Sequence, residues 1–155
     1  MRATLPYLGA EQTLKYMKIQ VIDSIPYVKY KFPRLRTAKD IYNYCKGLVR
    51  FREDPPGSEF VMKVQSLFNP KINPHGFSGA GDCDDFTVLS LACLFANGFR
   101  DNFVVIAGRT KSAPVHVYAA TKVNGKFIPI DLTNSEMIER GGYKYRQILP
   151  IRINH

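Results

Sequence analysis

The sequence predicts an α+β fold in which one buried helix packs on an antiparallel β-sheet. Residues 83–97, CDDFTVLSLACLFAN, are apolar on nearly every side of a helix, and a helix of that kind is buried within a domain. Three segments with strand character follow, at about 102–109, 114–123 and 126–131. Asn124-Gly125 joins the last two and is a strong signal for a tight hairpin. Because helical segments precede a run of strands, an antiparallel sheet against the buried helix is the expected arrangement.

The length favours a single domain. With 155 residues the chain is long enough to build its own hydrophobic core, and we expect one domain over 1–155. We divide it into a core at 37–134 and a basic N-terminal extension at 1–36, whose structure the sequence leaves uncertain. Within this extension a helix is expected at about 10–24, broken by Pro26, because proline removes a backbone donor and clashes with the preceding turn.

Further helical signals and a long loop precede the buried helix. Thr37-Ala38-Lys39-Asp40 resembles a capping box, and the helix that it begins should end before the turn sequence REDPPG. A short helix is expected at 58–67. The segment NPKINPHGFSGAG that follows is rich in glycine, proline and asparagine, and loops of this length in a compact domain are often functional.

The positive charge is concentrated near the N-terminus. The net charge is +9, and residues 1–52 hold 11 Lys and Arg against 3 Asp and Glu. Such a patch can contact nucleic acid or another anionic surface. A solvated basic face is the simpler interpretation, because the sequence contains no recognisable nucleic-acid-binding motif.

Neither a membrane span nor a secretion signal is recognisable. No stretch approaches the roughly 18 apolar residues of a membrane span, and the N-terminus becomes polar too early for a signal peptide. The three cysteines, Cys45, Cys83 and Cys93, form no CxxC pair, which argues against a disulfide framework and against a zinc cluster. We therefore expect a cytoplasmic or virion-associated protein that holds no metal and no other cofactor.

Cys83 is distinguished by its place at the start of the buried helix. Asp82 is a good N-cap residue, and Asp85 stands where a carboxylate can close a capping box. Asp84 is then expected to point to solvent. A thiol in the first turn lies near the positive end of the helix dipole, which favours the thiolate and lowers the pKa. The flanking aspartates oppose this effect, because nearby negative charge raises the pKa of a thiol, so a partner such as an imidazole must outweigh them.

The hairpin predicts which side chains can partner this thiol. If Asn124-Gly125 forms the turn, Val123 pairs with Lys126, and Tyr118 faces Asp131. His116 lies two residues before Tyr118, so it shares that face and has Asp131 as its diagonal neighbour. An imidazole that is oriented by a carboxylate and brought to the sulfur would form a thiolate–imidazolium pair.

These residues resemble the transglutaminase-like cysteine superfamily, whose papain-like core packs a cysteine-bearing helix on a sheet that carries histidine and aspartate. The resemblance rests on GDCDDFTVLSLACLFANG, VHVYAA and KFIPIDLT, and it covers about residues 40–134. It implies that Cys83 is the nucleophile, that His116 is the acid and base, and that Asp131 orients the histidine. Small stand-alone members occur in bacteria and their phages, which fits a chain of this length.

The resemblance implies acyl transfer on a peptide or protein substrate. Cys83 would attack an amide or ester carbonyl, and water or an amine would resolve the thioester; hydrolysis is favoured because so short a chain suggests no dedicated amine site. Many members have tryptophan where this sequence has Tyr118, so the substrate groove is where it departs from the family. The glycines before the helix would let a substrate backbone come close. We therefore expect Gly79, Gly81 and Tyr118 to contact the substrate.

Two other classes of function stay open. The fold could serve as a non-catalytic binding or structural module, for example in a phage particle. Alternatively, the basic N-terminal third could make this a nucleic-acid-associated protein, whose affinity for DNA or RNA would fall steeply with salt because phosphate contacts release counterions.

Overall fold

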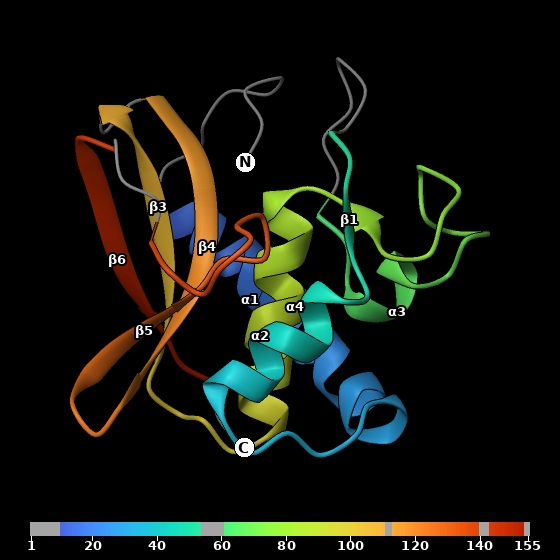
Figure 1. Ribbon diagram of the computed structural model, residues 1–155. Helices are drawn as coiled ribbons and strands as arrows, with labels where there is room; N and C mark the ends of the chain where they lie inside the picture. Colours follow the sequence, from blue (N-terminus) through green and yellow to red (C-terminus); the bar gives the residue numbers. More distant parts are fainter. Residues whose placement is uncertain (1–9, 54–60, 111–112, 140–142, 154–155) are drawn as a thin grey trace.

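The computed structural model describes residues 10–53, 61–110, 113–139 and 143–153. Its elements, in chain order, are α1 (Ala10–Lys31), α2 (Ala38–Lys46), β1 (Arg50–Phe51), α3 (Val64–Leu67), β2 (Ala80–Gly81), α4 (Cys83–Ala96), β3 (Asn102–Thr110), β4 (Ala113–Val123), β5 (Lys126–Ile130) and β6 (Tyr145–Ile151). Within the described ranges, four antiparallel strands form one sheet in the order β5-β4-β3-β6, and it lies along one side of α4 (Figure 1). The other helices lie around the remaining sides of α4. The α+β prediction is confirmed.

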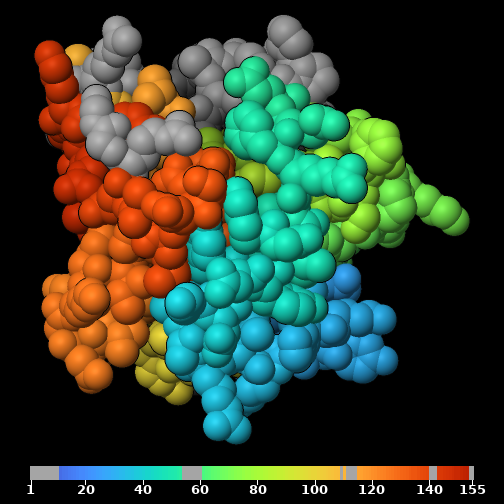
Figure 2. All heavy atoms as spheres, in the orientation of Figure 1, coloured from blue at the N-terminus to red at the C-terminus, as the bar shows by residue number. Residues whose placement is uncertain are grey.

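The helix α4 is the centre of the molecule, as its apolar sequence predicts. Every residue from 79 to 95 is buried. Figure 2 shows α2 and the segment after β5 meeting over α4, so that little of α4 is visible on this face. The main core joins α4 to the sheet and includes Leu89, Leu91, Val104, Ile106 and Ile130. Burial on all sides fixes the position of the N-terminal end of α4, where Cys83 lies.

The first helix is longer than its sequence predicts. We expected a helix at 10–24 broken by Pro26, but α1 continues through this proline to Lys31. Its inner face packs in the main core through Met17, Val21, Ile25 and Val28. Proline costs one backbone hydrogen bond and adds strain, but burial of the apolar face on both sides of Pro26 offsets this cost.

The second helix begins and ends as predicted. The Thr37 Oγ1 accepts a hydrogen bond from the Asp40 amide at 3.0 Å, which confirms the N-cap. The helix ends at Lys46, before the turn sequence REDPPG, and the chain then forms β1, which pairs in parallel with β2. Of the short helix expected at 58–67, α3 covers Val64–Leu67. Residues 61–63 are not helical, and residues 58–60 lie outside the described ranges.

The strand β6 was not predicted. It pairs antiparallel with β3 along its whole length, from Asn102 opposite Ile151 to Gly108 opposite Tyr145. Its inward and outward residues alternate, which is the pattern of an amphipathic strand at a sheet edge. Among the helices that the structure describes, none has the length and hydropathy needed to cross a membrane.

Candidate active site

Cys83 occupies the first turn of α4 behind a complete capping box. The Asp84 amide donates to Asp82 Oδ1 at 3.2 Å, and the Asp82 amide donates to Asp85 Oδ2 at 3.0 Å. The other oxygen of Asp85 accepts from the Met62 amide at 2.8 Å. The predicted N-cap and capping box are confirmed. Asp85 also fastens the segment before α3 to the start of α4.

Asp84 does not point to solvent as predicted. It is only 1% exposed, because the N-terminal turn of α4 is enclosed by the rest of the molecule as fully as the middle of the helix. Sequence alone suggests an outward carboxylate at this position, since consecutive helical residues point in different directions. It cannot reveal that every direction around this helix is occupied.

Burial changes the expected protonation of the thiol. Cys83 is 8% exposed, and its burial raises the pKa of the thiol from 9.0 to about 12, with the charges of Asp84 and Asp82 adding to the increase. A shift of this size disfavours the thiolate by about 4 kcal/mol. Burial and the two carboxylates therefore oppose the lowering of the pKa that the helix dipole was expected to give, and they favour the protonated thiol.

The hairpin register confirms the predicted proximity of His116 and Asp131. Asn124 and Gly125 have φ values of 52° and 77°, as a tight hairpin turn requires, and β4 pairs with β5 from Val123 opposite Lys126 onward. Beyond the last paired residue of β5, Asp131 Oδ2 lies 2.6 Å from His116 Nε2. Both side chains are buried, at 3% and 9% exposure. This contact holds the imidazole at Nε2 and determines which of its two nitrogens remains available.

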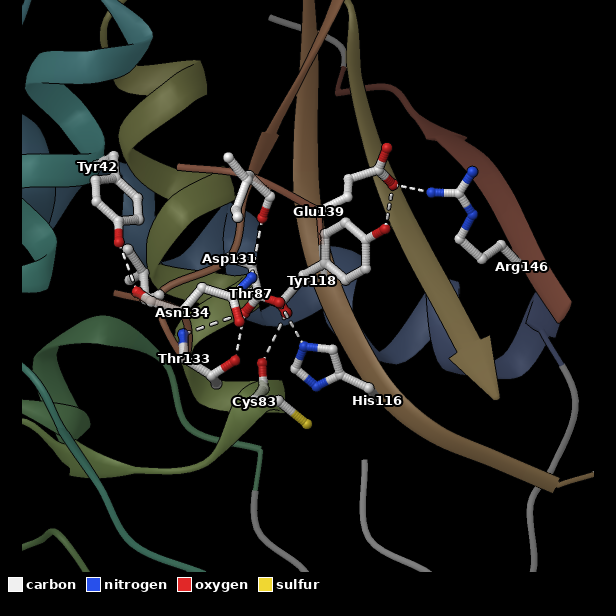
Figure 3. Close-up of polar contacts among 12 residues, drawn as sticks. Tyr42, Cys83, Thr87, His116, Tyr118, Asp131, Thr133, Asn134, Glu139 and Arg146 are labelled. Carbon is white, nitrogen blue, oxygen red and sulfur yellow. Dashed lines mark hydrogen bonds and ion pairs between the residues drawn. The ribbon is translucent and has the colours of Figure 1, made fainter. Parts of the chain in front are cut away.

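The other ring nitrogen of His116 faces the cysteine. With Nε2 engaged by Asp131, Nδ1 lies on the side of the ring that points toward Cys83 (Figure 3). Val117 and Ala119 pack in the core that contains α4. His116 is not part of this core, and Figure 3 shows it beside Cys83, the first residue of α4. The three side chains singled out from the sequence thus converge at one end of α4.

The carboxylate of Asp131 is supported by residues that the sequence did not identify. Its Oδ1 accepts from the Thr133 amide at 3.1 Å and from Thr133 Oγ1 at 2.7 Å. Burial alone would raise the pKa of Asp131, but the hydrogen bonds from His116 and Thr133 lower it below its ordinary value. A threonine two residues after an aspartate is a recognisable turn pattern and could have drawn attention to this contact.

The segment that carries Asp131 is tied to α2. The Tyr42 hydroxyl donates to the Asn134 carbonyl at 2.5 Å, and Lys46 Nζ donates to the Leu132 carbonyl at 2.7 Å. These contacts join residues about 90 positions apart. No local sequence pattern predicts these two contacts, because they depend on how α2 packs against the segment after β5.

Tyr118, Gly79 and Gly81, which we expected to contact the substrate, lie against other residues of the protein. Tyr118 is 3% exposed, stacks on His116 and donates its hydroxyl to Glu139. Gly79 has a φ of +83°, and a Cβ there would lie 2.1 Å from the Leu48 carbonyl oxygen. A Cβ at Gly81 would meet the Asp85 carboxylate at 2.7 Å. The atoms closest to these two glycines therefore belong to Leu48 and Asp85. That the glycines contact the substrate stays a prediction.

No group of three or more His, Cys, Asp or Glu side chains that could hold a metal ion occurs in the part of the chain that the structure describes. Cys45 and Cys93 lie in the core with their sulfur atoms 3.6 Å apart and both residues 0% exposed.

Comparison with known proteins identifies the family of this chain. A family model for a transglutaminase-like domain matches residues 10–150, a wider range than the 40–134 covered by the resemblance drawn from the sequence. No curated protein matches the chain. The crystal structure of a candidate protease from Parabacteroides distasonis is similar with a TM-score of 0.57 and 15% identity over 94% of this chain. This chain spans 30% of the length of that protein.

Two further structures are more distant. LapG from Legionella pneumophila has a TM-score of 0.45 and 14% identity, over 94% of this chain and 81% of that one. A candidate cysteine protease from Cytophaga hutchinsonii has a TM-score of 0.43 and 11% identity, over 98% of this chain and 55% of that one.

Proposed function

Because this chain belongs to the transglutaminase-like domain family, we propose that it is a cysteine-dependent acyl-transfer enzyme that hydrolyses an amide, peptide or ester bond. The observation that carries the proposal is the buried His116–Asp131 pair at the end of the helix that bears Cys83. A lone buried cysteine is ordinarily a small core residue. A cysteine beside an imidazole that a carboxylate orients has the parts of an activated nucleophile.

The high pKa of the thiol favours activation by a general base. As the Cys83 sulfur attacks the substrate carbonyl carbon, its proton passes to Nδ1 of His116, and Asp131 stabilises the imidazolium that forms. The negative charge that develops on the carbonyl oxygen would be stabilised by the backbone N–H of Cys83, an amide in the first turn of α4.

Collapse of this intermediate breaks the carbon–nitrogen or carbon–oxygen bond. The leaving amine or alcohol takes the proton from Nδ1, and the acyl group stays on sulfur as a thioester. Water then attacks the thioester carbon while Nδ1 accepts the proton of the water. The sulfur leaves, recovers that proton, and the carboxylic acid departs. An amine in place of water would give transamidation.

The substrate is proposed to be a peptide or protein, as in related cysteine hydrolases. Nothing in the described residues favours a dedicated amine site, so hydrolysis remains the preferred outcome. The name of one similar structure, a candidate protease, agrees with this choice of substrate class, although its similarity speaks for the fold alone.

The test is acylation of Cys83 by an activated ester. The protein is incubated with p-nitrophenyl acetate, and the adduct is located by peptide mass spectrometry before and after neutral hydroxylamine, which cleaves thioesters. We expect an acetyl group on Cys83 that hydroxylamine removes, and none in Cys83→Ala. His116→Ala should acylate about 100-fold more slowly, whereas His75→Ala, which removes a histidine of the preceding loop, should match the wild type. Acylation of Cys83 at equal rates in wild type and His116→Ala would overturn the proposal, as would its absence from the wild type.

A further inference from the structure

The ring of His116 is held by contacts beyond its bond to Asp131. The ring of Tyr118 stacks on it with centroids 5.6 Å apart and planes inclined by 29°. The ring of Tyr143 also stacks on it, at 5.9 Å and 20°. Two nearly parallel aromatic rings therefore define the plane in which the imidazole lies.

Tyr118 is itself fixed at both ends of its side chain. Its ring lies in a small buried cluster with Val105, Ala107 and Ala120, on the face of the sheet opposite α4. Its hydroxyl donates to Glu139 Oε2 at 2.5 Å. Displacement or tilting of this ring would both break the hydrogen bond and disturb the packing of the cluster.

Glu139 is anchored in turn by Arg146. The Nη1 of Arg146 contacts the same carboxylate oxygen that accepts from Tyr118, so the phenol and the guanidinium converge on one atom (Figure 3). Glu139 lies in the segment after β5, and Arg146 lies in β6. The chain thus joins three separate segments at a point next to His116.

The protonation of Tyr118 suits this role. Burial and the hydrogen bond to Glu139 both raise the pKa of the phenol above its ordinary value. The hydroxyl is therefore protonated across the physiological pH range and remains a donor to the carboxylate.

We propose that Tyr118, held by Glu139 and Arg146, is a positioning residue that fixes the plane of the His116 ring. Asp131 constrains the ring only at Nε2, and one hydrogen bond leaves the ring free to tilt about it. The stacked tyrosine removes this freedom, so that Nδ1 stays directed toward Cys83. This inference rests on the proposed function, since the orientation of Nδ1 matters only if it exchanges a proton with the thiol.

The test separates ring orientation from catalysis. The ¹⁵N signals of the His116 ring report its hydrogen bonding and tautomer, and they are recorded without substrate in wild type, Tyr118→Phe and Tyr118→Leu. Phenylalanine keeps the stacked ring and loses the anchor, whereas leucine loses both. Tyr145→Phe is the matched control, because it removes a phenol hydroxyl from β6 that bonds to Gln147 rather than to Glu139.

We expect the His116 signals to shift or broaden in Tyr118→Phe and more so in Tyr118→Leu, with no change in Tyr145→Phe. Acylation of Cys83 should fall about tenfold in Tyr118→Phe, because small displacements of a catalytic group are costly. Glu139→Gln keeps an acceptor for the phenol and should retain most of the rate, whereas Glu139→Ala should behave like Tyr118→Phe.

Unchanged His116 signals in both Tyr118 variants would overturn the inference, as would equal changes in Tyr145→Phe. If Tyr118→Leu fails to fold, the Tyr118→Phe spectrum decides alone. Because the spectra need no reaction, a wild type that is not acylated overturns the proposed function and leaves the effect of Tyr118 on ring orientation to be judged separately.

Discussion

The Nε2 of His116 and the Oδ2 of Asp131 are 2.6 Å apart, and this contact is formed by a hairpin whose register the turn residues fix. A slip of one residue would turn Asp131 to the other face of the sheet. The geometry of a two-residue turn therefore controls whether the histidine has a partner. The other oxygen of Asp131, Oδ1, accepts two hydrogen bonds from Thr133. Rotation of the carboxylate would therefore break its contacts with both His116 and Thr133.

Replacing Asp131 should slow the acylation of Cys83. In Asp131→Asn the shape is retained but the charge that stabilises the imidazolium is lost, so we expect acylation of Cys83 by p-nitrophenyl acetate to slow about 100-fold or more. Thr133→Val removes only the hydroxyl donor to Asp131 Oδ1 and should slow the reaction about fivefold, on the order of one modest hydrogen bond. Equal rates in wild type and Asp131→Asn would contradict a role for this carboxylate.

The same carboxylate should make stability depend on pH in the acidic range. Its pKa lies below the ordinary value of 3.8, so its contribution to folding is complete above that value and is lost as the pH falls through the lowered pKa. Urea unfolding of wild type and Asp131→Asn measures this contribution as a difference in free energy. As the pH falls from about 5 to about 2, the free energy of unfolding of the wild type should fall relative to that of Asp131→Asn. A difference that stays constant over this range would show that the native state does not hold the pKa down.

The sequence predicted the parts of the site that local rules determine. Asp82 is a good N-cap wherever it precedes a helix, and Asn124-Gly125 fixes a register that brings Asp131 to His116. The burial of Asp84 was not predicted, and the flanking aspartates indicated only part of the increase in the pKa of Cys83, because the burial of both residues depends on what surrounds the end of α4.

The errors in predicting α1 and β6 also arise from tertiary contacts. The helix α1 continues through Pro26 because its inner face is buried in the core, and burial outweighs the local preference to break. Strand β6 contains Pro150, and a proline weakens the sequence signal for a strand. The strand forms because it pairs with β3. Tertiary contacts decided each of these elements.

Labelling with iodoacetamide should distinguish a neutral thiol from a preformed thiolate. Since burial raises the pKa of Cys83 to about 12, native Cys83 should react at pH 8 at least about 100-fold more slowly than in urea-unfolded protein. Cys45 and Cys93, which are fully buried, serve as internal controls and should be slower still. Peptide mass spectrometry follows the three cysteines in one sample. Rapid labelling of Cys83 near pH 6 that disappears in His116→Ala would instead establish a thiolate–imidazolium pair in the resting protein.

Gly79 should be far less tolerant of substitution than Gly76. Both have positive φ values, +83° and +75°, so alanine at either position is strained by about 1 kcal/mol or more. Only at Gly79 would the added Cβ also lie 2.1 Å from the Leu48 carbonyl oxygen, a backbone atom that cannot move without displacing β1, whereas a Cβ at Gly76 meets nothing within 4 Å. We expect Gly79→Ala to lower the free energy of unfolding by about 3 kcal/mol or more and Gly76→Ala by about 1 kcal/mol, measured by urea unfolding. Equal losses in the two variants would mean that backbone strain dominates and that the loop yields at Leu48. A larger loss at Gly79 would show that its glycine is required for the backbone crossing that holds the start of α4, and with it Cys83, in place.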